Sequence, residues 1–534
     1  QADAQSISTE AALARVESPQ AQIHALSTDE RPGTVIFGLK PGTDLEQFAD
    51  RVRATGNARQ LRLLRPIDAV AVTTAEVDRL VQVVGARKEV AYAERSQRRE
   101  TKALDPYDGI DPRSGISYNW AYDAVAAGPA LAAVGGGSRF KIGIIDTGLD
   151  MTHPDLAGRA ANAYDALRGA EGQVSDAIGH GTFVAGLISM IDGNGIGARG
   201  VAGTTPILPV QATDDGSFVT EDILSGATWA QRKGARILNL SLGGESFSRS
   251  EARAFDRAYF SDVLPIASSG NEATKGNPVS YPAAYIGGTN GSWGIGLSVG
   301  ASRPDGTIAS FSTHNEYVSL AAPGASQSSC KRGVFSSIPV ARKSAWDEAD
   351  TCSLVFGSVG EKSGRYAYGE GTSFSTPIVA GLAALVLQAN PQLHSEQVGR
   401  ILQLSAKQPD GSVGWNEFTG YGNVNGGAAV ELAKRFDTEA PTFSASVRRG
   451  RSNVLIRTLA HEVTAAGRTP ATGISIAVRY SRNGGGFRSL KSARRKSLTS
   501  RVRLSPGRYS FEIGVCDSNL NCTAKRFGPM RVAG

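Results

Sequence analysis

The chain is 534 residues long, with 41% hydrophobic residues, 20% charged residues and a formal net charge of +7. This length exceeds what a single hydrophobic core supports, so we expect two or three domains. The longest apolar stretch, Ile378 to Leu387, is too short to cross a bilayer, and we expect no transmembrane segment. The chain lacks an initiator Met, and we expect it to begin at Gln1 after removal of an export signal.

The N-terminal part divides into a leader and a small domain. Residues 1–30 are polar and contain no aromatic residue, which predicts a poorly ordered leader. Residues 31–97 alternate strand-like runs such as TVIFGLK and AVAVTT with helical runs such as LEQFADRVRA and EVDRLVQVV. The pattern predicts a small α+β domain with the order β-α-β-β-α-β.

A linker and a larger domain follow. Residues 98–106 lie in the charged, aperiodic run ERSQRRETKALDP, which predicts an exposed linker open to processing. Between residues 107 and 436, strand-like runs such as KIGIID, ARILNLSL and VLPIASS alternate with helical runs. This alternation predicts an α/β fold, in which helices cover both faces of a parallel sheet. Ligand sites in such sheets form at the carboxyl ends of the strands.

The composition changes again near Phe436. Residues 437–534 carry short alternating runs such as ISIAVRYS and RYSFEIGV, which predict an all-β sandwich of the immunoglobulin or fibronectin type. From Pro441 to Gly534 there are 18 Lys and Arg against 3 Asp and Glu, a net charge of +15. Because the whole chain carries +7, the residues before Pro441 carry a net charge of −8.

The basic C-terminal domain has two interpretations. Its charge favours attraction to an anionic surface, such as a polysaccharide, lipid head groups or an acidic protein. In the alternative, the stems of its arginines cover strand surfaces and the domain binds no partner. Nucleic acid is disfavoured as a partner, because aromatic residues are few here and no nucleic-acid-binding motif occurs.

The four cysteines fall into two local pairs, Cys330 with Cys352 and Cys516 with Cys522. Metal binding needs tighter clusters, and none of the four cysteines neighbours a catalytic base. We therefore predict two disulfides. Disulfides persist in oxidising compartments, so we expect a secreted protein, either extracellular or periplasmic.

Three polar residues stand next to segments that would hold them rigidly. Asp146 ends the apolar run Phe140 to Ile145, His180 opens the helical segment HGTFVAG, and Ser373 precedes a long apolar helical pattern. A serine hydroxyl becomes an effective nucleophile when a histidine accepts its proton and a carboxylate orients that histidine. We therefore predict a catalytic triad. Taken singly, Asp146 could cap a turn, His180 could be an ordinary partly buried histidine, and Ser373 could cap a helix.

Five motifs in this order resemble the subtilisin-like serine peptidases (family S8) over roughly residues 105–434. They are DTG with HPDL, HGTFVAG, NLSLGG, SSGNE and GTSFSTP. Phe183 stands where the family usually carries histidine, and Phe374 where it usually carries methionine. Residues 31–97 resemble the inhibitor I9-like propeptide of this family, which assists folding of the protease and then blocks its cleft.

The resemblance implies roles for further residues. Asn271 would supply the side-chain donor of the oxyanion hole. Ser280 and Glu272 would border the first specificity pocket, which makes a basic substrate residue a candidate there. An extended peptide would pair with a segment on each side of the cleft, formed by Ser241, Leu242 and Gly243 and by Gly216, Ser217 and Phe218.

The resemblance also suggests structural calcium, although the reaction itself requires no cofactor. Asp155 and Asn194 match positions that bind calcium in some relatives, where loop carbonyls complete the oxygen shell. In the alternative, Asp155 caps a turn and Asn194 supplies a left-handed backbone position. Both interpretations of the two residues stay open at this point.

We therefore expect a secreted serine endopeptidase that is made as a self-processing zymogen. Its partners would be protein or peptide substrates and its own propeptide, which would act as an inhibitor. One rival is an esterase or amidase with the same nucleophile, and the substrate-pairing segments disfavour it. The other rival is an adhesion protein with a vestigial peptidase domain, which the intact triad and Asn271 disfavour.

Overall fold

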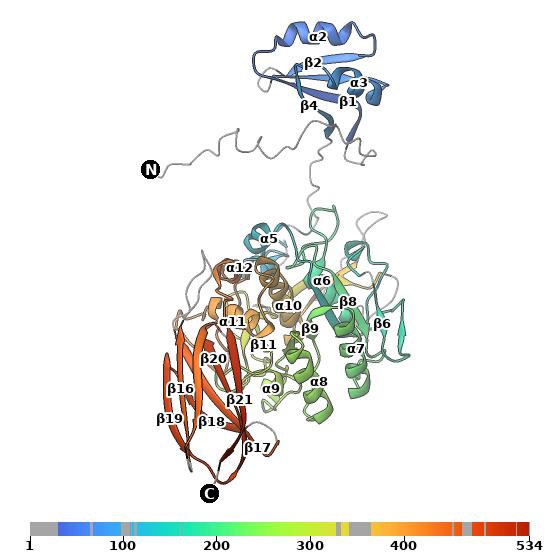
Figure 1. Cartoon of the computed structure of the whole chain (residues 1–534). Coiled ribbons are helices and arrows are strands. Elements are labelled where there is room, and N and C mark those ends of the chain that lie inside the picture. Colours follow the sequence, from blue (N-terminus) through green and yellow to red (C-terminus); the bar gives the residue numbers. More distant parts are fainter. Residues whose placement is uncertain are drawn as a thin grey trace. The chain divides into compact units, whose positions relative to one another are not determined.

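The computed structural model describes most of the chain in two compact units, divided between Lys102 and Ala103 (Figure 1). This division falls within the predicted linker 98–106. Residues 1–29 of the predicted leader and the predicted pair Cys330–Cys352 lie outside the described residues, whereas Glu30, the last residue of the predicted leader, begins a strand. The described residues are 30–64, 68–97, 107, 109–111, 115–160, 162–326, 333–340, 365–450, 453–461, 473–484, 488–519 and 521–532.

The first unit is an antiparallel sheet with two helices, in the order β-α-β-β-α-β that the sequence predicts. Asp44 accepts hydrogen bonds from the amides of Glu46 and Gln47 and so caps the first helix. The hydrophobic faces of both helices join the strands in one core. The elements are β1 (Glu30–Leu39), α2 (Leu45–Arg53), β2 (Gln60–Leu64), β3 (Ala69–Thr73), α3 (Val77–Gly85) and β4 (Val90–Gln97), with the sheet order β2-β3-β1-β4.

The second unit is built on an eight-stranded sheet, in which seven strands run parallel and the edge strand β7 antiparallel. This is the α/β sheet that the alternating pattern predicts. In order across the sheet, the strands are β12 (Leu320–Pro323), β11 (Leu297–Ser302), β10 (Leu264–Ser268), β9 (Ala235–Leu240), β5 (Lys141–Asp146), β8 (Ile207–Gln211), β6 (Tyr164–Asp165) and β7 (Ala170–Glu171).

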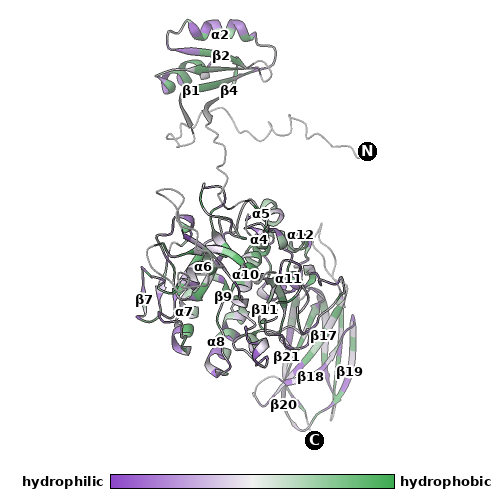
Figure 2. Ribbon diagram, turned by 180° about the vertical axis from the view of Figure 1, so that it is seen from behind, coloured by the Kyte–Doolittle hydropathy of each residue, from purple (hydrophilic) through white to green (hydrophobic). Residues whose placement is uncertain are grey.

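Helices cover both faces of this sheet. Ile142 and Ile144 of β5 belong to one core cluster and Ile145 to the other, because successive residues of a strand point to opposite faces. Figure 2 shows the hydrophobic residues, in green, along the interior strands and helices. The first face carries α5 (Ala127–Val134), α6 (His180–Ser189), α10 (Thr372–Ala389), α11 (Ser395–Ser405) and α12 (Gly426–Arg435), and the second carries α7 (Thr220–Arg232) and α8 (Arg249–Phe260).

Helix α10 forms the centre of the first core. Within the described part of the chain, it is the one helix that is long and apolar enough to cross a membrane, and 83% of that window is buried inside the protein. The shorter elements of this unit are α4 (Trp120–Ala124), η2 (Pro154–Leu156), η3 (Ala273–Lys275), α9 (Ala283–Ile286), β13 (Val334–Ile338) and β14 (Arg365–Gly369).

The C-terminal strands form two antiparallel sheets that enclose a separate core, as the predicted sandwich requires. The predicted disulfide Cys516–Cys522 is present and closes the hairpin between the last two strands. One sheet contains β15 (Thr442–Arg449), β16 (Asn453–His461) and β19 (Ser497–Arg503). The other contains β18 (Arg488–Ala493), β17 (Ile474–Arg482), β20 (Gly507–Asp517) and β21 (Cys522–Val532).

Buried polar contacts join the sandwich to the α/β part of the same unit. The side-chain amide of Gln397, in the first turn of α11, donates to Asn519 O at 2.9 Å and to Asn521 Oδ1 at 2.7 Å. Asn521 in turn donates to Asp437 O at 2.9 Å. Because Gln397, Asn521 and Asp437 are buried, loss of one partner would leave the others unsatisfied, which fixes the junction.

Candidate active site

Asp146 and His180 are hydrogen-bonded at the carboxyl end of β5. The side chain of Asp146 has no exposed surface, because the strand that it ends is buried on both faces. His180 Nδ1 lies 2.7 Å from Asp146 Oδ1, and the amide of Thr147 donates to the same oxygen at 2.8 Å. When Nδ1 donates to the carboxylate, the neutral imidazole keeps Nε2 able to accept a proton.

A second buried carboxylate, Asp176, fixes the start of the helix that carries His180. It accepts hydrogen bonds from the amides of Gly179 and Thr182 at 2.7 Å each, and from the hydroxyls of Thr147 at 2.8 Å and Thr182 at 2.7 Å. These bonds cap α6 and tie it to the residue after Asp146. The sequence analysis missed Asp176, although an Asp just before a helix start is a capping signal.

The surrounding charges set the protonation of His180. Burial opposes the charged imidazolium, but the charge of Asp146, its hydrogen bond and the charge of Asp176 outweigh burial and raise the pKa of His180 above its ordinary value. Its side chain keeps 23% of its surface exposed. The site therefore stabilises the state that the ring would adopt after accepting a proton.

Ser373 lies in the first turn of α10, and its backbone carbonyl is fixed by a hydrogen bond to the segment after β9. The hydroxyl of Ser241 donates to Ser373 O at 2.6 Å, and Asn239 Nδ2 donates to that hydroxyl at 2.9 Å. The side chain of Ser241 is thus used to support Ser373. Among the described residues, no hydrogen bond joins Ser373 to His180, and such bonds often tighten only when substrate binds.

The two departures from the family pattern are packed against each other. The ring centroids of Phe183 and Phe374 lie 4.4 Å apart, and that of Phe374 lies 5.3 Å from the ring of His180. Phe183 is fully buried and Phe374 is 5% exposed. The two phenylalanines therefore form one aromatic contact, and Phe374 extends it to the ring of His180.

Asn271 follows β10 and presents its side-chain amide in a fixed orientation. Its Oδ1 accepts hydrogen bonds from the amide of Thr372 at 2.9 Å and from the Thr372 hydroxyl at 3.0 Å. The oxygen is therefore turned toward Thr372, which leaves the Nδ2 donors to the open side. The adjacent amide of Ser373 belongs to the first turn of α10, whose N–H groups have no partner within the helix.

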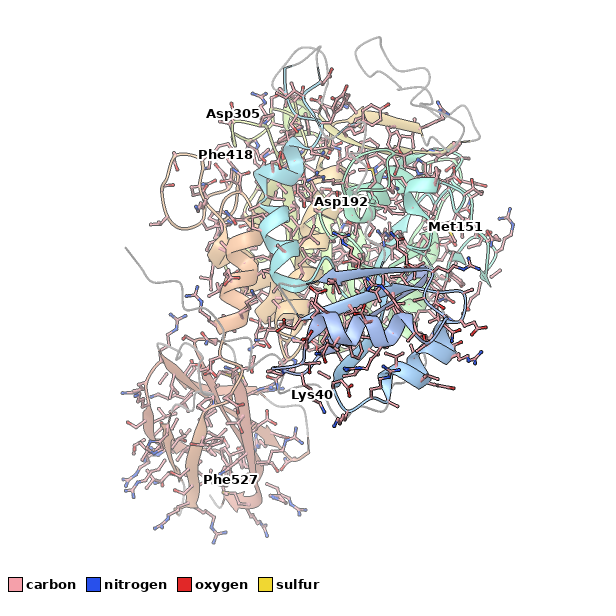
Figure 3. All side chains as sticks on the ribbon, turned by 90° about the horizontal axis from the view of Figure 1, so that it is seen from above. Lys40, Met151, Asp192, Asp305, Phe418 and Phe527 are labelled. Atoms are coloured by element: carbon pink, nitrogen blue, oxygen red, sulfur yellow. A yellow bond between two sulfur atoms is a disulfide. The ribbon has the colours of Figure 1, made fainter. Side chains whose placement is uncertain are left out.

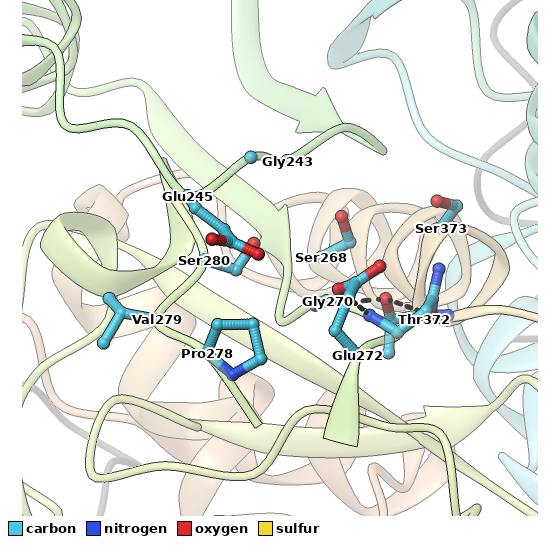
Figure 4. Close-up of a pocket in the computed structure, with 12 residues that line it drawn as sticks. Gly243, Glu245, Ser268, Gly270, Glu272, Pro278, Val279, Ser280, Thr372 and Ser373 are labelled. Carbon is cyan, nitrogen blue, oxygen red and sulfur yellow. Dashed lines mark hydrogen bonds between the residues drawn. The ribbon is translucent and has the colours of Figure 1, made fainter. Parts of the chain in front are cut away.

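A pocket of about 550 Å³ opens beside Ser373 (Figure 4). The predicted residues Gly243, Glu272 and Ser280 all line it, as do Asn271 and Ser373. Ser280 is buried, and a side chain at position 243 would collide with its hydroxyl, because a Cβ there would lie 2.7 Å from Oγ. This contact explains the first of the two glycines in NLSLGG.

The pocket also contains Glu245, which the sequence analysis missed. It stands directly after the glycines of NLSLGG, where no pattern distinguishes a pocket residue from a surface residue. Only the pairing of Gly244 with Tyr281, through hydrogen bonds of 2.9 and 2.8 Å, brings Glu245 next to Ser280.

The remaining predicted substrate-pairing residues do not line this pocket. Leu242 is buried, and its carbonyl accepts a hydrogen bond from Ser268 at 3.1 Å. Residues 216–218 lie in a loop, in which the amide of Gly216 donates to Thr213 and that of Ser217 to Asp215. Two of the amides that were predicted to face a peptide are therefore bonded within the loop, and the peptide-pairing role of 216–218 stays a prediction.

The two predicted calcium ligands, Asp155 and Asn194, lie side by side and are hydrogen-bonded to each other. Asn194 Nδ2 donates to Asp155 Oδ1 at 2.8 Å, and Tyr366 donates to Asp155 Oδ2 at 3.3 Å. Asn194 Oδ1 accepts the amide of Ile196. Calcium needs converging oxygen ligands, whereas here the amide nitrogen points at the carboxylate, so this donor set does not fit the ion. The loop's left-handed positions belong to its glycines, not to Asn194.

Comparison with known proteins gives the family. The model of the Subtilase family, Peptidase_S8, matches residues 137–422. The chain is 32% identical to subtilisin DY of Bacillus licheniformis over 298 residues, which cover 55% of this chain and 92% of that relative. It is 28% identical to an alkaline protease of Shouchella clausii over 416 residues, which cover 76% of this chain and 93% of that relative.

Fervidolysin of Fervidobacterium pennivorans is 31% identical over 326 residues, which cover 58% of this chain and 43% of fervidolysin. Its crystal structure superposes on 95% of this chain and 78% of its own, with a TM-score of 0.51 and 23% identity, and supports the fold. The chain therefore belongs to the subtilase family. It is a subtilisin-like serine endopeptidase.

Asp176→Asn should shift the pH dependence of hydrolysis to lower pH. A histidine base must be neutral, so kcat/KM rises with pH through the His180 pKa, and removing the Asp176 charge removes one cause that raises this pKa. The measurement is kcat/KM across pH with a peptide substrate. Asp150→Asn, which removes a half-buried carboxylate that is not among the causes of the His180 shift, is the control. An unchanged pH profile in Asp176→Asn would show that the charge of Asp176 does not raise the pKa of His180.

Proposed function

We propose that Ser373, His180 and Asp146 perform peptide hydrolysis through an acyl-enzyme intermediate. The observation that carries this proposal is the 2.7 Å contact between Asp146 and His180, on a sheet edge whose pocket reaches Ser373. Ser373 Oγ attacks the scissile carbonyl while His180 accepts its proton. His180 then donates that proton to the leaving amine, and a water molecule deacylates the enzyme by the same steps. Asp146 orients His180 and stabilises the imidazolium.

The negative oxygen of the tetrahedral intermediate would be bound by Asn271 Nδ2 and the amide of Ser373. The orientation that Thr372 imposes on the Asn271 side chain supports this assignment. Preorganised donors of this kind cost no rearrangement at the moment of reaction, and the positive end of α10 adds to the same field.

Peptides are favoured over simple esters as substrates because of the extended segment beside the pocket. Gly243 follows β9 and is exposed to solvent, so its backbone is open to an extended chain, whereas the amide and carbonyl of Gly244 are bonded to Tyr281. The specificity pocket then receives the side chain that precedes the scissile bond. The chemistry of the triad requires no cofactor.

We further propose a secreted zymogen whose first unit is the propeptide. The disulfide Cys516–Cys522 supports an oxidising compartment. The small α+β unit ends next to a charged run, and the chain divides into its two units within that run. In this proposal the native cut removes the first unit, which then inhibits the enzyme until it is degraded.

An anionic polysaccharide is the proposed partner of the sandwich. The outer face of the sheet β15-β16-β19 carries Arg448, Arg457, Arg501 and Arg503, and its three strands contain no Asp or Glu. On the other sheet, Glu512 forms ion pairs with Arg479 and Arg526. The strands of the sheet β15-β16-β19 thus carry positive charge without any carboxylate, whereas two arginines of the other sheet are paired with Glu512. Figure 3 shows nitrogen-tipped side chains extending from the sandwich around Phe527.

A fluorophosphonate probe should label the native enzyme at Ser373, because the activated hydroxyl displaces fluoride from phosphorus. Mass mapping of the tagged peptide identifies the site, and Ser373→Ala should stay unlabelled. Comparing casein with short-chain nitrophenyl esters then separates an endopeptidase from an esterase. A tag on another residue, or hydrolysis of esters without casein, would overturn the proposal.

Ser373→Ala should accumulate as one uncut chain, whereas the native protein should be cut between Glu94 and Asp105. The first cut should occur within one molecule, because the tethered linker has a high effective concentration at the cleft. The cutting rate of purified zymogen should then be independent of dilution. N-terminal sequencing of both proteins checks this. Processing of Ser373→Ala at the native position in a protease-deficient host would refute self-processing.

The double variant Arg457→Gln/Arg501→Gln should elute from heparin at lower salt than the native protein. The variant Arg479→Gln/Arg526→Gln removes the same charge from the other sheet and is the matched control. Retention should fall steeply with salt, because charges are screened within about 10 Å at 0.1 M. Equal elution of the two variants would show that net charge alone, and not this face, governs binding.

A further inference from the structure

Two carboxylates line the pocket beside the nucleophile. Glu245 reaches it from the loop after β9, and Glu272 from the loop after β10, so the two charges come from separate segments (Figure 4). Glu245 is exposed, whereas Glu272 is partly buried. Like charges around one cavity repel each other, and a cation that entered the cavity would relieve that repulsion.

Each carboxylate is held on a constrained backbone. The Gly244–Tyr281 pairing fixes the segment that carries Glu245. Glu272 Oε2 accepts the amide of Asn271 at 2.7 Å, and the amide of Glu272 donates to Thr313 at 3.1 Å. The Glu272 charge is therefore anchored one residue from the proposed oxyanion donor, and its position does not depend on a flexible loop.

Neither carboxylate is neutralised by a cationic side chain of the described residues. The rest of the pocket wall is largely uncharged. Pro278 and Val279 contribute apolar side chains, and the glycines contribute main-chain atoms. A pocket with an apolar wall and unpaired negative charges matches a side chain with an aliphatic stem and a positive head.

We propose that Glu245 and Glu272 select arginine or lysine at the residue immediately before the scissile bond. This inference rests on the proposed function and names its substrate class. It also implies that the linker contains residues that the enzyme itself can recognise. Arg98, Arg99 and Lys102 all lie in the run where the zymogen is proposed to be cut, so the enzyme's own chain offers the class of residue that this pocket accepts.

The test compares fluorogenic peptides that differ only in this residue, with arginine, citrulline or phenylalanine. Citrulline has nearly the shape of arginine without its charge, so the arginine-to-citrulline ratio of kcat/KM isolates the electrostatic preference. We expect this ratio to be at least about tenfold in the native enzyme, and to fall as salt is added. A ratio near one would overturn the inference.

Three variants assign the preference to residues. Glu245→Gln and Glu272→Gln should each lower the arginine-to-citrulline ratio by about fivefold, the scale of one partly exposed ion pair. Glu417→Gln removes an exposed carboxylate that does not line the pocket and should leave the ratio unchanged. Since Glu272 also bonds Asn271, Glu245→Gln is the variant that separates specificity from an effect on the oxyanion donor.

The outcomes distinguish this inference from the proposed function. If phenylalanine is preferred over arginine, or if the Glu417 variant lowers the ratio as much as the Glu245 variant, the inference fails while the peptidase assignment stands. If no peptide is cut and no fluorophosphonate is incorporated at Ser373, the proposed function itself fails. N-terminal sequencing of the mature enzyme adds a third readout, because the inference requires the native cut to follow Arg95, Arg98, Arg99 or Lys102.

Discussion

The site depends on one buried charge, the carboxylate of Asp146. A carboxylate with no exposed surface is strongly destabilising unless hydrogen bonds and a nearby positive charge compensate for its lost hydration. The amide of Thr147 and the ring of His180 both bond to Oδ1, while Oδ2 has no hydrogen-bond partner among the described residues. Neutral hydrogen-bond donors thus replace only part of the hydration that the carboxylate has lost. The positive charge of a neighbouring imidazolium would provide the remaining stabilisation.

The parallel sheet places the other residues of the site next to this buried carboxylate. Strands β5, β9 and β10 end at the same edge, so Asp146, the glycines after β9 and Asn271 converge although they are far apart in sequence. Helices α6 and α10 pack on one face of the sheet and begin at that edge with His180 and Thr372. The fold brings the proposed base, nucleophile and oxyanion donor to the edge where Asp146 is buried.

Motifs with strong local constraints were predictable from the sequence. The run KIGIID had to be a buried strand that ends in a carboxylate, and GTSFSTP had to begin a helix, so the positions of Asp146 and Ser373 followed from pattern and resemblance together. The order of elements in the first unit and the disulfide Cys516–Cys522 followed in the same way.

What sequence could not give depends on contacts between distant segments. Glu245 enters the pocket only through the Gly244–Tyr281 pairing, and Asp176 acts by joining Thr147 to α6. The calcium interpretation is likewise not supported by the contacts of its two residues. Position alone could not reveal that Tyr366, more than two hundred residues after Asp155 in the chain, donates a hydrogen bond to that carboxylate and takes part of the place of a cation.

The charge distribution poses a problem of self-recognition that the fold resolves. A protease that cuts after basic residues carries its own sandwich with 18 Lys and Arg. Binding in the cleft needs an extended segment with free backbone groups, whereas Arg457, Arg479 and Arg501 lie in strands whose backbone is paired with neighbouring strands. Opening such a strand means breaking the ladder and exposing the core beneath it. The charged run between the two units has no apolar periodicity that would commit it to a core. Local stability, and not composition, therefore decides which basic residues of this chain can serve as substrates.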